Sequence, residues 1–224
     1  MDIIEKALAE GRTTLSEYES KILLKTYGIP VTKEILATDM DGLMEAAGKI
    51  GYPLVLKGSS TKIAHKTEKG LIKVDIRNKE EAREAFTEIM GAMDVDDGAV
   101  LVQEMVKGQR ELVVGLTRDP QFGPCVMFGL GGIFTEILKD ISFRVAPLEK
   151  RDALEMMQDI KGHKILEAVR GMEAADLDRL AEILIAVGNI GLEHEAIKEI
   201  DMNPVILSGS RPIVVDALVV LEKA

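Results

Sequence analysis

The hairpin predicted near the end of the sequence carries polar side chains that strand interiors normally exclude. Residues 195–207 and 211–220 are largely apolar runs separated by a Gly-Ser turn, which predicts two paired strands. Asp201 and Asn203 interrupt the first run, and Asp216 interrupts the second. Strands disfavour Asp and Asn, so we expect a function that compensates for placing three oxygen-bearing side chains there.

The pairing of this hairpin brings the three side chains together. Asp201 and Asn203 are two residues apart and therefore project from one face of their strand. With the turn centred between Gly209 and Ser210, the residue opposite Asn203 is Asp216. Carboxylate and amide oxygens suit Mg²⁺, which often shares them with substrate phosphates. The hairpin predicts a magnesium site; the alternative is a set of surface acids with no common role.

The rest of the chain predicts an α+β fold. Apolar residues at helical spacing, with caps at Ser16 and Asn78, predict helices within residues 14–28, 39–51, 78–93, 150–160 and 174–190. A strand is predicted after the first helix, which Gly28 and Pro30 end, and further strands are predicted within residues 52–60, 70–76, 98–106, 110–130 and 132–148. Hairpins interspersed with helices indicate mostly antiparallel sheets. A change in composition near residues 103–108 divides the chain into subdomains 1–103 and 104–224.

Composition excludes several classes of partner and location. The net charge of −10 argues against nucleic acid, which proteins bind through Lys and Arg. No run of 18 apolar residues and no signal-peptide pattern occurs, so we expect no membrane span. Cys125 is the only cysteine, which excludes an internal disulfide and fits a cytoplasmic protein.

Ordered motifs along the chain resemble the ATP-grasp superfamily. They are "YPLVLK", "VLVQEMVKGQRELVVG" and "EIDMNP" followed by "VDA". "TKIAHKTEKGLIKV" and "FGPCVMFGLGGIFTEILKDISFRVAPL" resemble one branch, the β subunit of ADP-forming acetyl-CoA synthetase, which is related to the succinyl-CoA synthetase β subunit. The resemblance implies two α+β subdomains that clamp ATP or ADP with Mg²⁺. Leu71 departs from the branch, which usually has a second Gly at this position.

The resemblance also implies roles for residues in the first subdomain and at the boundary. Lys57 follows an apolar strand and would contact the phosphates as a point charge; the alternative is a surface lysine ending a strand. Gln103, Glu104 and Val106 would form the hinge, whose main chain reads adenine. Glu111 would hold the ribose or metal, or else be an exposed acid paired with a neighbouring Arg110 or Lys107.

Two more sets of residues are candidates for the phosphate site. The "GLGG" stretch at 129–132 would let the backbone approach a ligand, or is a plain turn; Glu136 and Arg144 flank it. His65 lies in a polar, Gly- and Lys-containing stretch typical of an exposed loop. The resemblance implies that His65 takes phosphate from a partner's phosphohistidine and delivers it to ADP. A neutral imidazole nitrogen is a competent nucleophile near pH 7.

The same resemblance implies an incomplete enzyme. It places the CoA-binding domains and a phosphorylated histidine in an α subunit, in an α2β2 assembly. In agreement with this, no G-x-G-x-x-G pattern follows a strand in the sequence. The implied reaction converts acyl-CoA, ADP and phosphate into an organic acid, ATP and CoA. A stand-alone carboxylate ligase and a non-catalytic nucleotide-binding regulatory domain are the alternatives.

Overall fold

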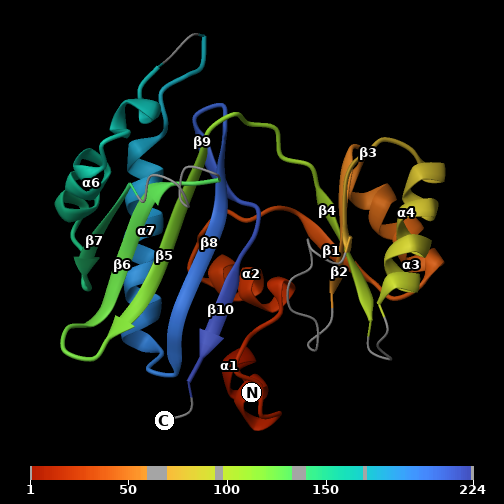
Figure 1. The fold of residues 1–224 in the computed structure, drawn as a ribbon, viewed down its shortest axis with the longest axis horizontal. Helices are drawn as coiled ribbons and strands as arrows, with labels where there is room; N and C mark the ends of the chain where they lie inside the picture. The colour runs from red at the N-terminus through yellow and green to blue at the C-terminus, as the bar shows by residue number, and fades with distance from the viewer. Residues whose placement is uncertain (1, 60–69, 94–97, 133–139, 169–170, 223–224) are drawn as a thin grey trace. The chain divides into compact units, whose positions relative to one another are not determined.

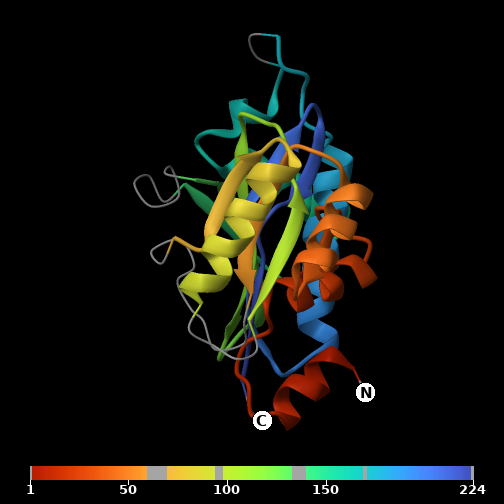
Figure 2. The same cartoon turned by 90° about the vertical axis from the view of Figure 1, so that its right-hand side faces the viewer.

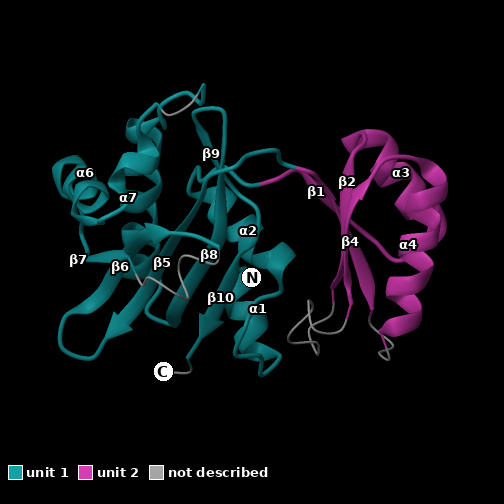
Figure 3. Ribbon diagram, turned by 45° about the horizontal axis from the view of Figure 1, so that its top comes forward, with its two compact units in different colours: residues 1–31, 106–224 teal, residues 32–105 magenta. Residues whose placement is uncertain are grey.

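The computed structural model describes residues 2–59, 70–93, 98–132, 140–168 and 171–222. The chain forms two compact units (Figure 3): unit 2 is residues 32–105, and unit 1 combines residues 1–31 with 106–224. The described ladders between named strands are all antiparallel. The predicted α+β fold with mostly antiparallel sheets is therefore confirmed. Among these described residues, no helix has the length and apolar character needed to cross a bilayer.

Unit 2 is a four-stranded sheet with two helices on one face (Figure 1). The strand order is β1 (Glu34–Ala37), β4 (Ala99–Glu104), β2 (Leu54–Ser59) and β3 (Ile72–Ile76), and the helices are α3 (Met40–Ile50) and α4 (Lys79–Ala92). Asp39 and Asn78 cap the N-termini of these helices, because their side chains accept hydrogen bonds from the N–H groups of Gly42 and Glu81, three residues further on. Leu56 and Val102 face the helices in a buried apolar core.

Unit 1 is a six-stranded sheet in which β8 is central to the predicted site. The strand order is β10 (Leu218–Leu221), β8 (Ile197–Ser208), β5 (Glu111–Asp119), β6 (Gly123–Leu130) and β7 (Ile141–Val145), and β9 (Arg211–Val214) also pairs with β8. The helices are α1 (Ile3–Ala9), α2 (Glu17–Thr26), α6 (Lys150–Asp159) and α7 (Leu177–Glu193), with a short 3₁₀ turn η1 (His163–Leu166). The sequence prediction did not include α1 or η1.

The two faces of the unit 1 sheet differ in what covers them. Helices α6 and α7 pack on one face (Figures 1 and 2), where Leu116, Val126 and Phe128 are almost completely buried. The alternate residues of the same strands project from the other face. We call this second face, which lies away from α6 and α7, the open face.

The N-terminal segment corrects the predicted subdomain boundary. The predicted division at 103/104 lies close to the observed change of unit at 105/106, but residues 1–31 belong with the C-terminal unit. The N–H of Leu15 donates to the carbonyl of Val219, and the N–H of Val214 donates to the carbonyl of Pro30. Leu24 joins the unit 1 core. The prediction failed here because these contacts join residues about 200 positions apart in the sequence.

The Leu71 departure from the family pattern has a local explanation. The positive φ of this turn, 67°, belongs to Gly70, so the second position does not require glycine. The Leu71 side chain is fully buried in the unit 2 core, and its carbonyl accepts from the N–H of Gly58. Leu71 therefore serves packing.

Candidate functional site

The hairpin has the register that the sequence predicted, with a break where the site lies. Val205 pairs with Val214 in β9, and Asp201 pairs with Leu218 in β10. Both pairs belong to one antiparallel register, which is interrupted at residues 215–217 between β9 and β10. Carried through the break, this register places Asp216 opposite Asn203. The second strand of the predicted hairpin is therefore broken at Asp216 into β9 and β10.

Asp201 and Asn203 lie on the open face. The residue between them, Met202, is fully buried in the unit 1 core together with Ile200. The strand alternation therefore turns both polar side chains away from that core. The structure brings Asp201, Asn203 and Asp216 to neighbouring positions on one face of unit 1.

Electrostatics support a cation site at these positions. Burial, followed by the negative charges of Glu199 and Asp216, raises the pKa of Asp201 to about 6. A divalent cation would relieve this repulsion, and two carboxylates with an amide are suitable oxygen donors for Mg²⁺. Among the described residues, no group of three or more His, Cys, Asp or Glu side chains has metal-site geometry. The predicted ligands do not form such a group, because Asp201 and Asp216 are carboxylates and Asn203 is an amide.

Glu199 is the neighbour that the sequence analysis missed. It pairs with Thr117 on one side and with Val220 on the other, and it lies two residues before Asp201 on β8. The same two-residue spacing that linked Asp201 with Asn203 was the available signal. Glu199 is exposed, and its charge contributes to the field at Asp201.

Lys57 lies in unit 2, on the face of its sheet away from α3 and α4. Its side chain is 4% exposed, and its Cα partners are Leu101 on β4 and Ile72 on β3. The fully buried Gln103, paired with Val55, lies on the same face as Lys57. A buried lysine differs from the surface lysine of the alternative interpretation.

The predicted hinge forms hydrogen bonds to other residues of unit 2. The carboxylate of Glu104 accepts from the N–H of Lys33 at 2.8 Å, and the N–H of Glu104 donates to the carbonyl of Lys33 at 3.0 Å. The N–H of Met105 donates to Pro53. The change of unit falls directly before Val106. The N–H groups of Glu104 and Met105 are therefore engaged within unit 2.

Glu111 packs against the glycine-rich turn. The N–H of Gly131 donates to the Glu111 carbonyl at 2.8 Å. Gly132 has a φ of 62°, and a Cβ there would lie 2.5 Å from the Glu111 carboxylate oxygen. Arg110 is not the ion-pair partner considered above, because its guanidinium donates to backbone carbonyls, including those of Glu173 and Gly209. The turn therefore leaves room for the Glu111 side chain.

Arg144 does not share a face with the metal-site residues. It pairs with the buried Val126, and its guanidinium forms an ion pair with Asp159 of α6 at 2.6 Å. Arg144 thus lies on the helix-covered face of the sheet, whereas Asp201 lies on the opposite, open face. His65 and Glu136 lie outside the described residues.

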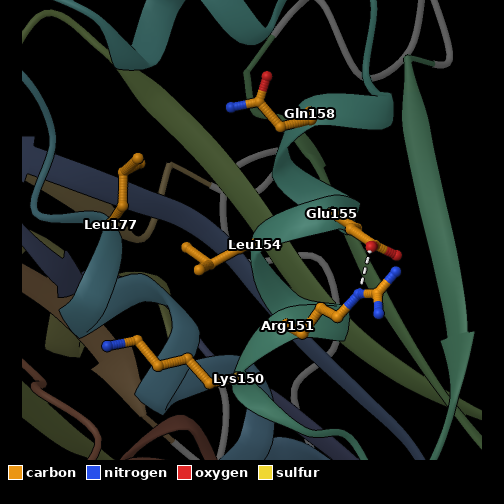
Figure 4. Close-up of a pocket in the computed structure, with 6 residues that line it drawn as sticks. All are labelled: Lys150, Arg151, Leu154, Glu155, Gln158 and Leu177. Carbon is orange, nitrogen blue, oxygen red and sulfur yellow. Dashed lines mark hydrogen bonds and ion pairs between the residues drawn. The ribbon is translucent and has the colours of Figure 1, made fainter.

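A groove on the surface of unit 1 is separate from these residues. Its volume is about 580 Å³, and it lies over α6 and the start of α7 (Figure 4). Its lining comprises Lys150, Arg151, Leu154, Glu155, Gln158 and Leu177. None of the predicted site residues lines it, so the chemistry of the open face, rather than this groove, identifies the site.

Comparison with known proteins identifies the family of this chain. The model of the ATP-grasp domain family matches residues 6–221. The β subunit of ADP-forming acetate–CoA ligase I of Pyrococcus furiosus is 49% identical over 98% of this chain and 97% of its own length. The chain belongs to the ATP-grasp family. Within it, the chain belongs to the branch of β subunits of ADP-forming acetate–CoA ligases.

Solved ATP-grasp structures show the same fold. Acetyl-coenzyme A synthetase 1 of Ca. Korarchaeum cryptofilum, in complex with coenzyme A, Ca-AMPCP and HgCl⁺, matches with a TM-score of 0.94 and 44% identity, covering 99% of each chain. Another structure of that enzyme contains Mg-AMPPCP and a phosphohistidine segment pointing towards the nucleotide-binding site. The ADP-forming acetate–CoA ligase I of Archaeoglobus fulgidus is 40% identical, but this ATP-grasp chain spans only 33% of its length.

Proposed function

We propose that this chain is the nucleotide-handling subunit of an ADP-forming acyl-CoA synthetase. It transfers a phosphoryl group between a phosphohistidine and ADP, with Mg²⁺ as cofactor. The observation that carries the proposal is the single register that gathers Asp201, Asn203 and Asp216 on the open face of an ATP-grasp sheet. In the direction of ATP synthesis, the N–P bond of phosphohistidine breaks and a β-phosphate oxygen of ADP bonds to phosphorus. The imidazole nitrogen keeps the electron pair.

Residues of both units have roles in this step. Asp201, Asn203 and Asp216 would hold Mg²⁺, which neutralises phosphate charge during transfer when it is bound. Lys57 contacts phosphate oxygens, since a buried ammonium is a strong charge in a low dielectric. The hinge, Gln103 to Val106, binds adenine through main-chain groups. Glu111, held beside Gly132, binds the ribose or the metal.

The remaining partner is a protein. The CoA-binding domains and a phosphorylated histidine reside in an α subunit, and the assembly is α2β2 in the cytoplasm. A separate partner subunit is supported by relatives in which the matched region is a subunit of its own and others in which it is about a third of a longer chain. His65 receives the phosphoryl group from the partner's phosphohistidine and passes it to ADP.

The test combines nucleotide binding with phosphoryl transfer. Titration calorimetry of the isolated chain should show Mg²⁺-dependent ADP binding. In the complex reconstituted with the α subunit, His65→Ala should abolish ATP formation while acyl-CoA and phosphate still phosphorylate the α subunit. Normal ATP formation by His65→Ala would exclude the relay through His65. Absence of nucleotide binding at millimolar ADP would exclude the proposed function as a whole.

A further inference from the structure

A buried carboxylate outside the site described above lies next to the glycine-rich turn. Asp140 directly precedes β7 and is 8% exposed. Its two carboxylate oxygens accept hydrogen bonds from the N–H groups of Lys161 and Gly162, each at 2.7 Å. Consecutive backbone N–H groups suit an anion, and hydrogen bonds to a carboxylate are stronger than those between neutral groups. The connection between α6 and η1 therefore holds Asp140 through both oxygens.

Asp140 also contacts the glycine-rich turn, by which we mean residues 129–132. The N–H of Leu130 donates to the Asp140 carbonyl at 3.3 Å. The Leu130 side chain packs on Gly162, where a Cβ would lie 2.7 Å from the Leu130 Cδ1. The turn is thus in contact with Asp140 and with one of the two residues that hold the Asp140 carboxylate.

The glycine-rich turn also contacts Glu111. The N–H of Gly131 donates to the Glu111 carbonyl at 2.8 Å, and Gly132 leaves room beside a Glu111 carboxylate oxygen. Contacts therefore run without a break from Asp140 through the turn to Glu111. A displacement of the turn would change the space that the Glu111 side chain occupies, because closely packed interiors transmit small shifts to their neighbours.

We propose that Asp140 is a positioning residue for nucleotide binding: it fixes the glycine-rich turn, and the turn fixes the Glu111 carboxylate. This inference rests on the proposed function, in which Glu111 binds the ribose or the metal. Asp140 acts through the turn and does not itself contact the nucleotide. The alternative is a residue that only caps the connection after α6, and such a residue would matter for stability alone.

Asp140→Asn tests the proposal with a side chain of the same shape. The amide keeps one oxygen acceptor but turns an NH₂ group towards the second backbone N–H, so one of the two hydrogen bonds is lost. We expect the Kd of the isolated chain for Mg²⁺-ADP to rise about tenfold. In the complex reconstituted with the α subunit, the KM for ADP should rise by a similar factor while kcat changes little. Partial unfolding would instead lower kcat and leave KM unchanged.

Ser142→Ala is the matched control at the same end of the sheet. Ser142 is 7% exposed, and its hydroxyl donates to the Met156 carbonyl of α6 at 2.8 Å. The loss of this hydrogen bond also weakens the attachment of β7 to α6, but the hydrogen bond does not involve the glycine-rich turn. Both variants should therefore lower the urea midpoint of unfolding, whereas only Asp140→Asn should weaken ADP binding.

A double-mutant cycle tests whether Asp140 acts through Glu111. Glu111→Gln should itself weaken Mg²⁺-ADP binding, since Glu111 is a proposed nucleotide contact. If the turn couples the two residues, adding Asp140→Asn to Glu111→Gln should raise the Kd by less than about twofold further. An undiminished effect of Asp140→Asn in that background would show that Asp140 acts independently of Glu111 and would overturn the inference.

Gly162→Ala keeps the inference testable if Asp140→Asn does not fold. The φ of Gly162 is −84°, which alanine adopts readily, and the added Cβ would press on Leu130 and on the Asp140 carboxylate. We expect this variant to raise the KM for ADP as well.

The remaining outcomes also overturn the inference. Wild-type Kd and KM for ADP in folded Asp140→Asn, or in Gly162→Ala where the former does not fold, would show that nucleotide binding does not depend on Asp140. An equal loss of ADP affinity in Ser142→Ala would indicate general loosening of the unit. A wild-type chain that does not bind Mg²⁺-ADP would overturn the proposed function and this inference with it, whereas wild-type binding with unchanged variants contradicts only the role of Asp140.

Discussion

Asp201 lies half-buried beside two other carboxylates, and this environment determines how the metal-free chain responds to pH. Burial is the largest cause of its raised pKa, followed by the charges of Glu199 and Asp216. A raised carboxyl pKa means that the folded chain binds a proton more tightly than the unfolded chain. Stability should therefore fall as pH rises from about 4 to about 6, and the full penalty applies above pH 6.

Asp201→Asn should consequently stabilise the metal-free chain at pH 8 and not at pH 3. The expected gain is on the order of 1–3 kcal/mol, because the variant removes a charge that the folded state disfavours. Urea unfolding in EDTA at the two pH values measures it. The exposed Asp178→Asn is the control and should change stability little at either pH. An equal effect of Asp201→Asn at both pH values would contradict the electrostatic explanation.

Asp216→Asn tests the metal site at the opposite strand. The amide keeps the shape of the side chain and removes its charge, so the fold should persist while Mg²⁺ is held less tightly. We expect turnover of the reconstituted complex to fall about a hundredfold or more, since metal ions supply several kcal/mol of charge stabilisation in such transfers. Circular dichroism checks the fold, and a coupled ATP assay checks the rate. Wild-type turnover would show that Asp216 is not a ligand.

Among the elements, the start of β5 is joined to the β8–β9 turn and to the connection between α6 and α7 by Arg110, the residue directly before the strand. Its side chain is buried, and its guanidinium donates to four carbonyls, of Ile165, Glu167, Glu173 and Gly209. Gly209 is in the β8–β9 turn, so Arg110 fixes the end of the strand that bears Asp201 and Asn203. The planar fork of arginine suits this set of acceptors, and the compact ammonium of lysine does not.

Arg110→Lys should therefore lower stability by about 2–3 kcal/mol, although the charge is kept. Urea unfolding gives the change in stability. Arg144→Lys, which alters a partly exposed ion pair, is the control and should cost less than about 1 kcal/mol. Equal losses in the two variants would refute a special role for the buried guanidinium.

At the scale of the molecule, the two units have different requirements for folding. Unit 2 is one continuous stretch, residues 32–105, with its own apolar core. Unit 1 needs both ends of the chain, because Leu15, Leu24 and Ile29 complete its core and the N–H of Leu221 donates to the Thr13 carbonyl. The units that the structure defines should therefore behave differently from the subdomains predicted at 103/104.

Truncation tests this difference. A chain of residues 106–224 should fail to unfold cooperatively, because part of its apolar core is missing. Residues 1–31 joined by a short flexible linker to residues 106–224 should unfold in one cooperative transition. Denaturant titration followed by circular dichroism compares the two. Cooperative unfolding of residues 106–224 alone would show that the N-terminal segment is dispensable.

The sequence by itself determined the helices and strands of both units, apart from α1 and η1, and the register of the hairpin that bears Asp201, Asn203 and Asp216. Caps, turns and apolar periodicity are local properties, and a two-residue turn fixes which residues of a hairpin face each other. Only the tertiary structure decided that residues 1–31 join unit 1, that Arg144 lies on the helix-covered face and that Glu199 adds to the charge at Asp201. These features depend on packing and pairing between segments far apart in the chain, which no local pattern specifies.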